Sequence, residues 1–219
     1  MTDNSIDHII WACPDLESGI DQFEVMSGVR AVAGGKHPKL GTHNALVHLG
    51  NRSYLEIVAP DPDHDGGPWS RSLQELTEPI LLHWVIARSN LGDYTKGLSG
   101  LIGGDNEVGS IARRHPTLGE LNWEILLFPQ HDYGCLVPFL IDWRDSTHPT
   151  ELLEHQCTLR NVRISTPDLP NMMKVASWLG IDAEFAEASK PKLQFQIDTP
   201  KGEVHLATPE PLPMGVTFE

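Results

Sequence analysis

The sequence has few cysteines and few basic residues, and it lacks a long hydrophobic run. Its three cysteines, Cys13, Cys135 and Cys157, are widely spaced without a Cys-x-x-Cys pair, which argues against a disulfide framework or a thiolate zinc site. Sixteen basic residues against thirty acidic ones give a net charge of −14, which disfavours nucleic acid and anionic membrane surfaces as partners. The best apolar run, residues 80–87, is interrupted by His83 and is far shorter than the ~20 residues of a membrane helix.

Several motifs and signals are also missing. The N-terminus has neither the basic start nor the long apolar core of a signal peptide, so we expect a cytoplasmic protein with reduced thiols. The sequence contains no P-loop, no Gly-x-Gly-x-x-Gly and no Gly-x-Ser-x-Gly, so nothing supports nucleotide binding or serine hydrolysis. A chain of 219 residues with 40% hydrophobic content can still bury one sizeable core or two linked ones.

Two pairs of segments repeat each other. Residues 113–127 match residues 35–49 with five identities in register, which are His37 with His115, Pro38 with Pro116, Leu40 with Leu118, Gly41 with Gly119 and Asn44 with Asn122. Residues 81–91 also overlay on residues 6–16 and place His83 over His8. Such repeats predict a duplicated structural unit in which each copy contributes to a common site.

The local pattern predicts the same order of elements in each copy. Residues 6–13 are typical of a buried strand, Asp15 can cap a helix that stops at Gly28, and three alternating segments follow. We therefore predict an α+β protein built from strand-helix-three-strand units. The predicted boundaries are a first unit at 1–60, a linker at 61–80, a second unit at 81–149, a looser third unit at 157–208 and a C-terminal arm at 209–219. Three prolines and two adjacent glycines predict that the linker is an irregular loop.

Six short motifs make the chain similar to a known superfamily. They are Asp7-His8-Ile9, Gly34-Gly35-x-His37, Gly41-Thr42-x-Asn44, Tyr54-Leu55-Glu56-Ile57, the segment 138–143, and His148-Pro149. Together they resemble the vicinal-oxygen-chelate superfamily, which contains glyoxalase I, bleomycin-resistance proteins and extradiol dioxygenases, and within it the glyoxalase-like proteins. The resemblance implies repeated βαβββ modules that form a cup-shaped, barrel-like mixed sheet with flanking helices.

The resemblance also implies a set of metal ligands. In that superfamily the first and last strands of the modules supply a cleft that holds a divalent metal, and the matching positions here are His8, Glu56 and His83. If the first and third modules form the cleft instead, His205 is the alternative third ligand. Two imidazoles and a carboxylate suit Zn, Mn, Ni or Fe(II) and leave positions open for substrate. The glutamate that is the base in glyoxalase I has no equivalent in the last strand of the second unit, which argues against glyoxalase I chemistry. The candidate bases are therefore Glu56, once detached from the metal, and a nearby histidine.

Five further residues are candidates for substrate contact. They are His37, Asn44, Trp84, Trp143 and His148. For each of them the alternative is a structural role, in a loop for the histidines and Asn44 or in the core for the tryptophans.

Three functions follow from the resemblance. The first is a metal-dependent enzyme of lyase or isomerase type that chelates vicinal oxygens of a small metabolite. The second is a metal-free protein that binds or sequesters a small molecule, as bleomycin-resistance proteins do, and the third is an Fe(II) extradiol-type dioxygenase. A small molecule is the expected partner in all three. The cleft is completed either within one chain or across a homodimer.

Overall fold

The apolar segment near the N-terminus forms strand β1 (Ile6–Ala12), and helix α1 (Leu16–Ser27) follows it. The carboxylate of Asp15 caps this helix by accepting a hydrogen bond of 2.8 Å from the backbone N–H of Ser18. Gly28 ends the helix with a φ of 78°, a left-handed conformation that glycine adopts without strain. This computed structural model describes residues 6–103, 106–115, 119–128 and 131–213.

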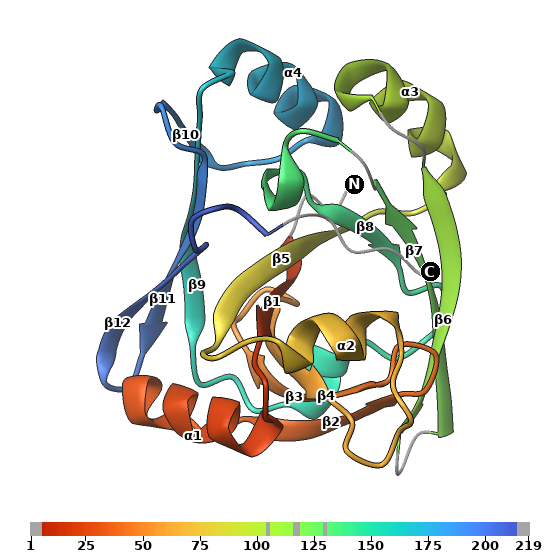
Figure 1. Cartoon of the computed structure of the whole chain (residues 1–219), viewed down its shortest axis with the longest axis vertical. Helices are drawn as coiled ribbons and strands as arrows, with labels where there is room; N and C mark the ends of the chain where they lie inside the picture. Colours follow the sequence, from red (N-terminus) through yellow and green to blue (C-terminus); the bar gives the residue numbers. More distant parts are fainter. Residues whose placement is uncertain (1–5, 104–105, 116–118, 129–130, 214–219) are drawn as a thin grey trace.

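Two βαβββ units follow each other along the chain. The first is completed by β2 (Val32–His37), β3 (Thr42–His48) and β4 (Tyr54–Pro60). The second consists of β5 (Ile80–Ala87), α3 (Gly92–Ile102), β6 (Glu107–His115), β7 (Gly119–Leu127) and β8 (Phe139–Asp142). The predicted α+β architecture with a curled mixed sheet and flanking helices is therefore confirmed (Figure 1).

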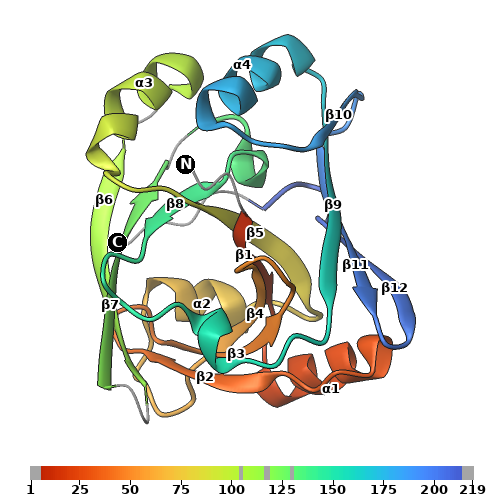
Figure 2. The ribbon, with the colours of Figure 1, turned by 180° about the vertical axis from the view of Figure 1, so that it is seen from behind.

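The eight strands of these units close into one barrel. Their order is β1-β4-β3-β2-β6-β7-β8-β5, so that β1 lies between a parallel β4 and an antiparallel β5 (Figure 2). The seam between β2 and β6 is held by the single residue pair Lys36 and Arg114. Because the strands alternate, one apolar cluster fills the barrel and a second covers its outside, where α1 packs.

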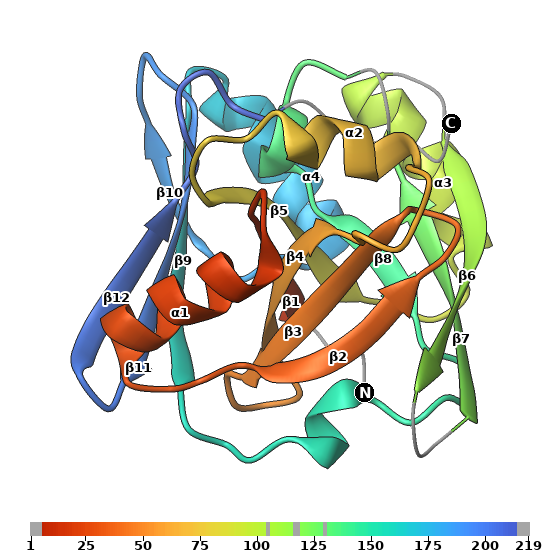
Figure 3. The ribbon, with the colours of Figure 1, turned by 60° about the horizontal axis from the view of Figure 1, so that its bottom comes forward.

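One end of the barrel is covered by a helix that the sequence did not predict. The expectation of an irregular linker is wrong for part of its length, because α2 (Pro68–Gln74) forms there. Proline at the first helical position is already held in a helical φ, which explains how so short a helix starts. Its Trp69 packs into the interior cluster, and Figure 3 shows α2 lying over the barrel strands.

The third unit forms a separate sheet. Strands β9 (Thr158–Thr166), β10 (Glu184–Glu187), β11 (Lys192–Thr199) and β12 (Gly202–Ala207) lie in the order β10-β9-β11-β12, with α4 (Leu169–Leu179) after β9. Phe195 of this sheet packs edge-on against Trp84 of the barrel, with ring centroids 5.9 Å apart. Two short 3₁₀ helices, η1 (Gly134–Leu136) and η2 (Pro149–Leu152), lie in the connections around β8. The part of the predicted arm from 214 to 219 lies outside the described residues.

In the part of the chain that the structure describes, no helix has the length and apolar character needed to cross a membrane.

Candidate functional site

The barrel encloses a small cavity of about 50 Å³. The residues of the first unit that line it are His8, Ile10, His37, Leu40, Thr42, Asn44, Tyr54, Glu56 and Val58. Trp69 of α2 and the second-unit residues Ile111, Trp123, Ile125, Ile141 and Trp143 complete the wall. A cavity of this size holds a few waters or the reacting end of a small molecule, and its polar groups come from one unit.

Glu56 lies at the centre of the polar part of the cavity wall. It is 9% exposed and its two carboxylate oxygens have different neighbours. Oε1 accepts a hydrogen bond of 2.5 Å from the Nδ2 of Asn44 and lies 3.9 Å from the Nε2 of His37. Oε2 lies 3.6 Å from the Nε2 of His8. Four neighbouring strands, β1 to β4, thus bring two imidazoles and an amide to one buried carboxylate.

Asp7 holds His8 from the side opposite Glu56. The Nδ1 of His8 lies 2.7 Å from Asp7 Oδ1. The other carboxylate oxygen, Oδ2, accepts a hydrogen bond of 2.9 Å from the indole N–H of Trp143 and lies 3.2 Å from the Nε2 of His148. Burial alone would raise the pKa of Asp7, but hydrogen bonds from His148 and His8 and their charges outweigh it and lower the pKa to about 2. Asp7 is therefore ionised at neutral pH and fixes a proton on Nδ1 of His8, which leaves Nε2 facing the cavity.

Aromatic rings surround this polar group. Tyr54 stacks on His8 with ring centroids 4.8 Å apart, and Trp123 lies 5.1 Å from Trp143 and edge-on to His37. Such rings exclude water and strengthen the electrostatic interactions of the groups they enclose.

The predicted ligand His83 does not line the cavity. Its register partner on β1 is Ile10, so its side chain is on the same barrel face as His8 and two positions along. Its ring stacks on Phe139 at 3.6 Å and burial lowers its pKa to about 3. Nδ1 lies 3.0 Å from the carbonyl oxygen of Trp84, and Nε2 is buried without a hydrogen-bond partner.

Of the other candidates, some meet at the cavity and some lie elsewhere. His37, Asn44 and Trp143 line it, and His148 lies behind Asp7. Trp84 is fully buried outside the barrel interior, where its indole N–H donates to the carbonyl oxygen of Cys135. His205 is on the exposed face of the other sheet, paired with Glu203, and is not brought to His8 and Glu56.

Three important residues were not singled out from the sequence. Asp7 was overlooked because it alternates with His8 along β1 and was assigned to the opposite face, although an acid in an apolar strand was a usable signal. Tyr54 belongs to a motif of the resemblance, but nothing in the sequence gives it a role. For Trp123 the sequence leaves an aromatic pocket wall and core packing open, and the structure places it in the cavity wall.

The residues present do not fit the implied three-ligand metal site. His8 and Glu56 converge, but the third predicted ligand, His83, is behind Phe139. Among the described residues, no group of three or more His, Cys, Asp or Glu side chains is arranged to hold a metal ion.

The sequence repeat and the structural repeat differ by three residues. Ile86, which overlays on Trp11, is paired with Leu140 as Trp11 is with Ile57, so Leu140 is the counterpart of Ile57. Ala45 is paired with Ile57 and Leu126 with Leu140, so Ala45 corresponds to Leu126, whereas the five identities would align it with Trp123. Since a shift by an odd number of residues exchanges the two faces of a strand, Asn44 points into the barrel while Asn122 is exposed. Two residues of the repeat, Pro116 and Leu118, lie outside the described part of the chain.

Comparisons with known proteins agree with this architecture. The family model described as a glyoxalase-like domain matches residues 6–180. A hypothetical protein from Staphylococcus aureus superposes with a TM-score of 0.57 at 16% identity, over 95% of this chain and 87% of that one, which shows a shared fold.

Two epimerase structures match less of the chain. Methylmalonyl-CoA epimerase from Mycobacterium tuberculosis has a TM-score of 0.45 and 20% identity, covering 63% of this chain and 86% of its own. A variant of the Streptomyces coelicolor methylmalonyl-CoA epimerase, in complex with 2-nitronate-propionyl-CoA, has a TM-score of 0.44 and 19% identity, covering 67% and 99%. No curated protein matches the sequence.

Proposed function

The chain belongs to the family of glyoxalase-like domains, and we propose that it is an enzyme that moves a proton on a small oxygenated metabolite held in the barrel. The observation that carries this proposal is the convergence of Glu56 with His8 and His37 on a small cavity with an otherwise apolar wall. A buried carboxylate with imidazole neighbours is the arrangement typical of general acid–base catalysis.

In the proposed reaction Glu56 is the base. It takes a proton from the carbon next to a carbonyl group, the C–H electron pair forms a C=C bond, and the C=O π pair moves onto the oxygen, so that an enediolate-like oxyanion forms. Returning the proton to the same carbon on its other face completes an epimerisation. Returning it to the former carbonyl carbon, while the proton of the neighbouring hydroxyl moves to the oxyanion, completes an isomerisation. The balance needs no oxidant and no second substrate.

The other polar groups of the cavity orient Glu56 and stabilise the oxyanion. Asn44 donates to Oε1 of Glu56, which leaves Oε2 as the oxygen free to take the proton. His37 can donate to the developing oxyanion through its Nε2, which lies 3.9 Å from Glu56 Oε1. His8, whose proton is held on Nδ1 by Asp7, presents an unprotonated Nε2 to the cavity and can accept a hydrogen bond or a proton there. The aromatic wall of Tyr54 and Trp123 keeps water away from that charge.

A divalent metal, which the superfamily resemblance implies, would supply Lewis-acid stabilisation of the same oxyanion. His8 and Glu56 are the candidate ligands in the cavity, and the third ligand is lacking there. We therefore derive no step through a metal, and we propose elemental analysis of the protein and of His8→Ala as the test. If wild type contains a stoichiometric ion and the variant does not, Glu56 is a metal ligand and not the base.

The acid–base proposal is tested by solvent exchange. A panel of α-hydroxy ketones, α-hydroxy aldehydes and 2-methyl-3-oxo acid thioesters is incubated with the protein in D₂O, and loss of the C–H signal is followed by NMR. Wild type is expected to exchange at least one compound, and Glu56→Gln to slow that exchange by about 10²- to 10⁴-fold. Glu184→Gln, an exposed glutamate on β10, is the matched control and should exchange normally.

A second candidate is a sequestering protein, which is favoured by the aromatic lining of the cavity. It predicts chemical-shift changes of the indole N–H signals on adding a ligand, without deuterium incorporation. Binding without exchange by both wild type and Glu56→Gln would favour this candidate over the enzyme.

A further inference from the structure

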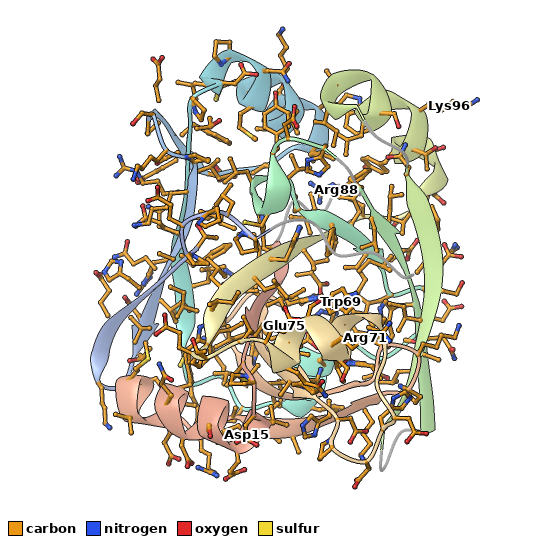
Figure 4. The ribbon with its side chains drawn as sticks, in the orientation of Figure 1. Asp15, Trp69, Arg71, Glu75, Arg88 and Lys96 are labelled. Carbon is orange, nitrogen blue, oxygen red and sulfur yellow. The ribbon has the colours of Figure 1, made fainter. Side chains whose placement is uncertain are left out.

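A second and larger cleft of about 540 Å³ opens at the end of the barrel opposite α2. Register fixes its position: β1 starts beside the last residues of β5, and Ala87 of β5 is paired with Ile141 of β8. Ile141 and Trp143 line both this cleft and the inner cavity. In Figure 4, Arg88 lies beyond the end of β5, on the side of α3 and α4, while Trp69 lies on α2. The inner cavity and the outer cleft therefore follow one another along the barrel axis.

The cleft concentrates arginine in a strongly acidic protein. Three of the nine arginines of the chain, Arg52, Arg88 and Arg144, line it, although the net charge is −14. Arg88 is 8% exposed and donates to the carbonyl oxygens of Ala87 and Leu179, which fixes its cation in the wall.

The other two arginines keep donors for a ligand. Arg52 uses Nη1 for Glu151 at 3.2 Å, and Arg144 uses Nη2 and Nε for Glu124 and Asp142. A guanidinium has five N–H donors, so the Nη2 of Arg52 and the Nη1 of Arg144 stay available among the described contacts. Their side chains are 53% and 51% exposed, and a ligand can reach them from solvent.

The backbone of the cleft is strained where these arginines sit. Among the described residues, four non-glycine residues have a positive φ, and Arg52, Asn90 and Arg144 of these four line the cleft. Arg52 is a central residue of the tight turn between β3 and β4, closed by the bond from Ser53 N to Gly50 O, at a φ of 60°.

Arg144 starts a similar turn, closed by Ser146 N and Trp143 O, at a φ of 53°. Glycine meets such angles without strain, whereas an arginine costs roughly 1 kcal/mol at each position. A strained backbone conformation persists in a protein where the side chain at that position has a function. The strain at Arg52 and Arg144 therefore supports a binding site in this cleft.

We propose that this cleft binds the anionic end, a carboxylate or a phosphate, of the molecule whose reacting carbon enters the inner cavity. Planar guanidinium groups bind both anions with paired hydrogen bonds. Three aspartates, Asp7, Asp93 and Asp142, also line the cleft. The carboxylate of Asp7 accepts from His8, His148 and Trp143, and that of Asp142 accepts from the backbone N–H groups of Asn90 and Arg144. Asp93 lies in the first turn of α3, where the helix N-terminus stabilises its charge. The link to the inner cavity rests on the proposed function, but anion binding in the cleft does not.

The test measures binding of simple anions to the whole protein. Inorganic phosphate and malonate are titrated by calorimetry and by the shift of the Trp143 indole N–H signal, assigned with Trp143→Phe, with uncharged malonamide as a control. Either anion is expected to bind and malonamide not to bind. The preference between phosphate and malonate identifies the anionic group, and equal binding of malonamide would overturn the proposal.

Variants separate a binding role from a structural one. Arg52→Gln and Arg144→Gln are each expected to weaken anion binding at least tenfold, and the exposed control Arg160→Gln to leave it unchanged. Arg144→Gly relieves the turn, so we expect it to lose binding while its melting temperature stays equal or rises. Binding that survives the double variant Arg52→Gln/Arg144→Gln would refute the site. Glu56→Gln should bind anions normally, so failure of catalysis and failure of this site are distinguishable.

Discussion

The two βαβββ units of the barrel have the same topology but contribute opposite chemistry. Every ionisable residue in the described wall of the inner cavity, namely His8, His37, Tyr54 and Glu56, comes from the first unit, while the described residues of the second supply isoleucines and tryptophans. Phe139 occupies the position that Glu56 occupies in the first unit, because Val85 is paired with Phe139 as the overlaid Ile10 is with Glu56, and Ile141 lies two residues further along the same face. The two similar units thus close one barrel, in which the second unit forms an apolar wall that faces the polar wall of the first.

The largest effect is expected from making the first unit as apolar as the second. Glu56→Leu should lower the exchange rate by about 10²- to 10⁴-fold, because the base is lost. The melting temperature should change by only a few degrees, since the leucine is surrounded by Ile10 and Val58. Deuterium exchange and thermal unfolding measure both effects, with Glu184→Leu as the exposed control. Exchange at the wild-type rate would disprove the role of Glu56.

The converse change makes the second unit polar. Ile141→Glu buries an uncompensated carboxylate at a site that is 1% exposed, and we expect a loss of about 3 kcal/mol, or a melting temperature lower by roughly 6–12 °C. Burial raises the pKa of such a carboxyl above its unfolded value, so the loss should be largest at neutral pH and smaller near pH 4. Val108→Glu on β6, where the side chain is 45% exposed, is the control and should unfold like wild type. An unchanged melting temperature for Ile141→Glu would show that this wall is not dry.

The same variant sharpens the question of a metal. If His8 and Glu56 are ligands, a carboxylate at position 141 supplies a third one, and added Mn²⁺ or Zn²⁺ should raise the melting temperature of Ile141→Glu more than that of wild type. Equal shifts in both proteins would show that the added carboxylate completes no site.

The next largest effect on stability is expected from replacing Asp7. The overlay of the first strands places Leu82 at its position in the second unit, so only the first histidine has an acidic partner. Asp7→Asn removes a charged acceptor from His8, His148 and Trp143 and should cost about 2 kcal/mol, or roughly 4–8 °C in melting temperature.

The pH dependence of stability identifies this contribution. The pKa of Asp7 is about 2 in the folded protein against 3.8 normally, so its stabilisation is present above pH 4 and is lost as the pH falls towards 2. Urea unfolding between pH 5 and pH 2 should show this step in wild type and lack it in Asp7→Asn. Asp198→Asn, at an exposed ion pair, should keep the step.

At pH 7 the smallest effect concerns the second-unit histidine. His83 has a pKa of about 3 because it is buried, while an unfolded chain protonates it near pH 6.5. The unfolded state therefore binds more protons below pH 6.5, and stability falls by up to about 1.4 kcal/mol per pH unit through this residue. His83→Leu should remove that slope and raise the melting temperature at pH 7 by a few degrees, because an unsatisfied buried acceptor is lost. Loss of exchange activity in His83→Leu would instead make His83 a member of the site.

Local signals in the sequence determined most of the fold. Asp15 and Gly28 bound the first helix, and alternating apolar residues marked the strands, because caps and strand faces depend on neighbours along the chain. His8 and Glu56 were identified as partners from their motifs, and the structure brings them to 3.6 Å.

The remaining features depend on packing between distant segments. Only the tertiary structure decided that β7 is shifted by three residues against the sequence repeat, which exposes Asn122 and turns Trp123 inward, because register is set by pairing with β6 and β8. It also decided that Phe139 stacks on His83, and that Asp7 meets His148, 141 residues away in the chain. Residue type and spacing specify which groups are available, whereas strand register and barrel closure specify which of them meet.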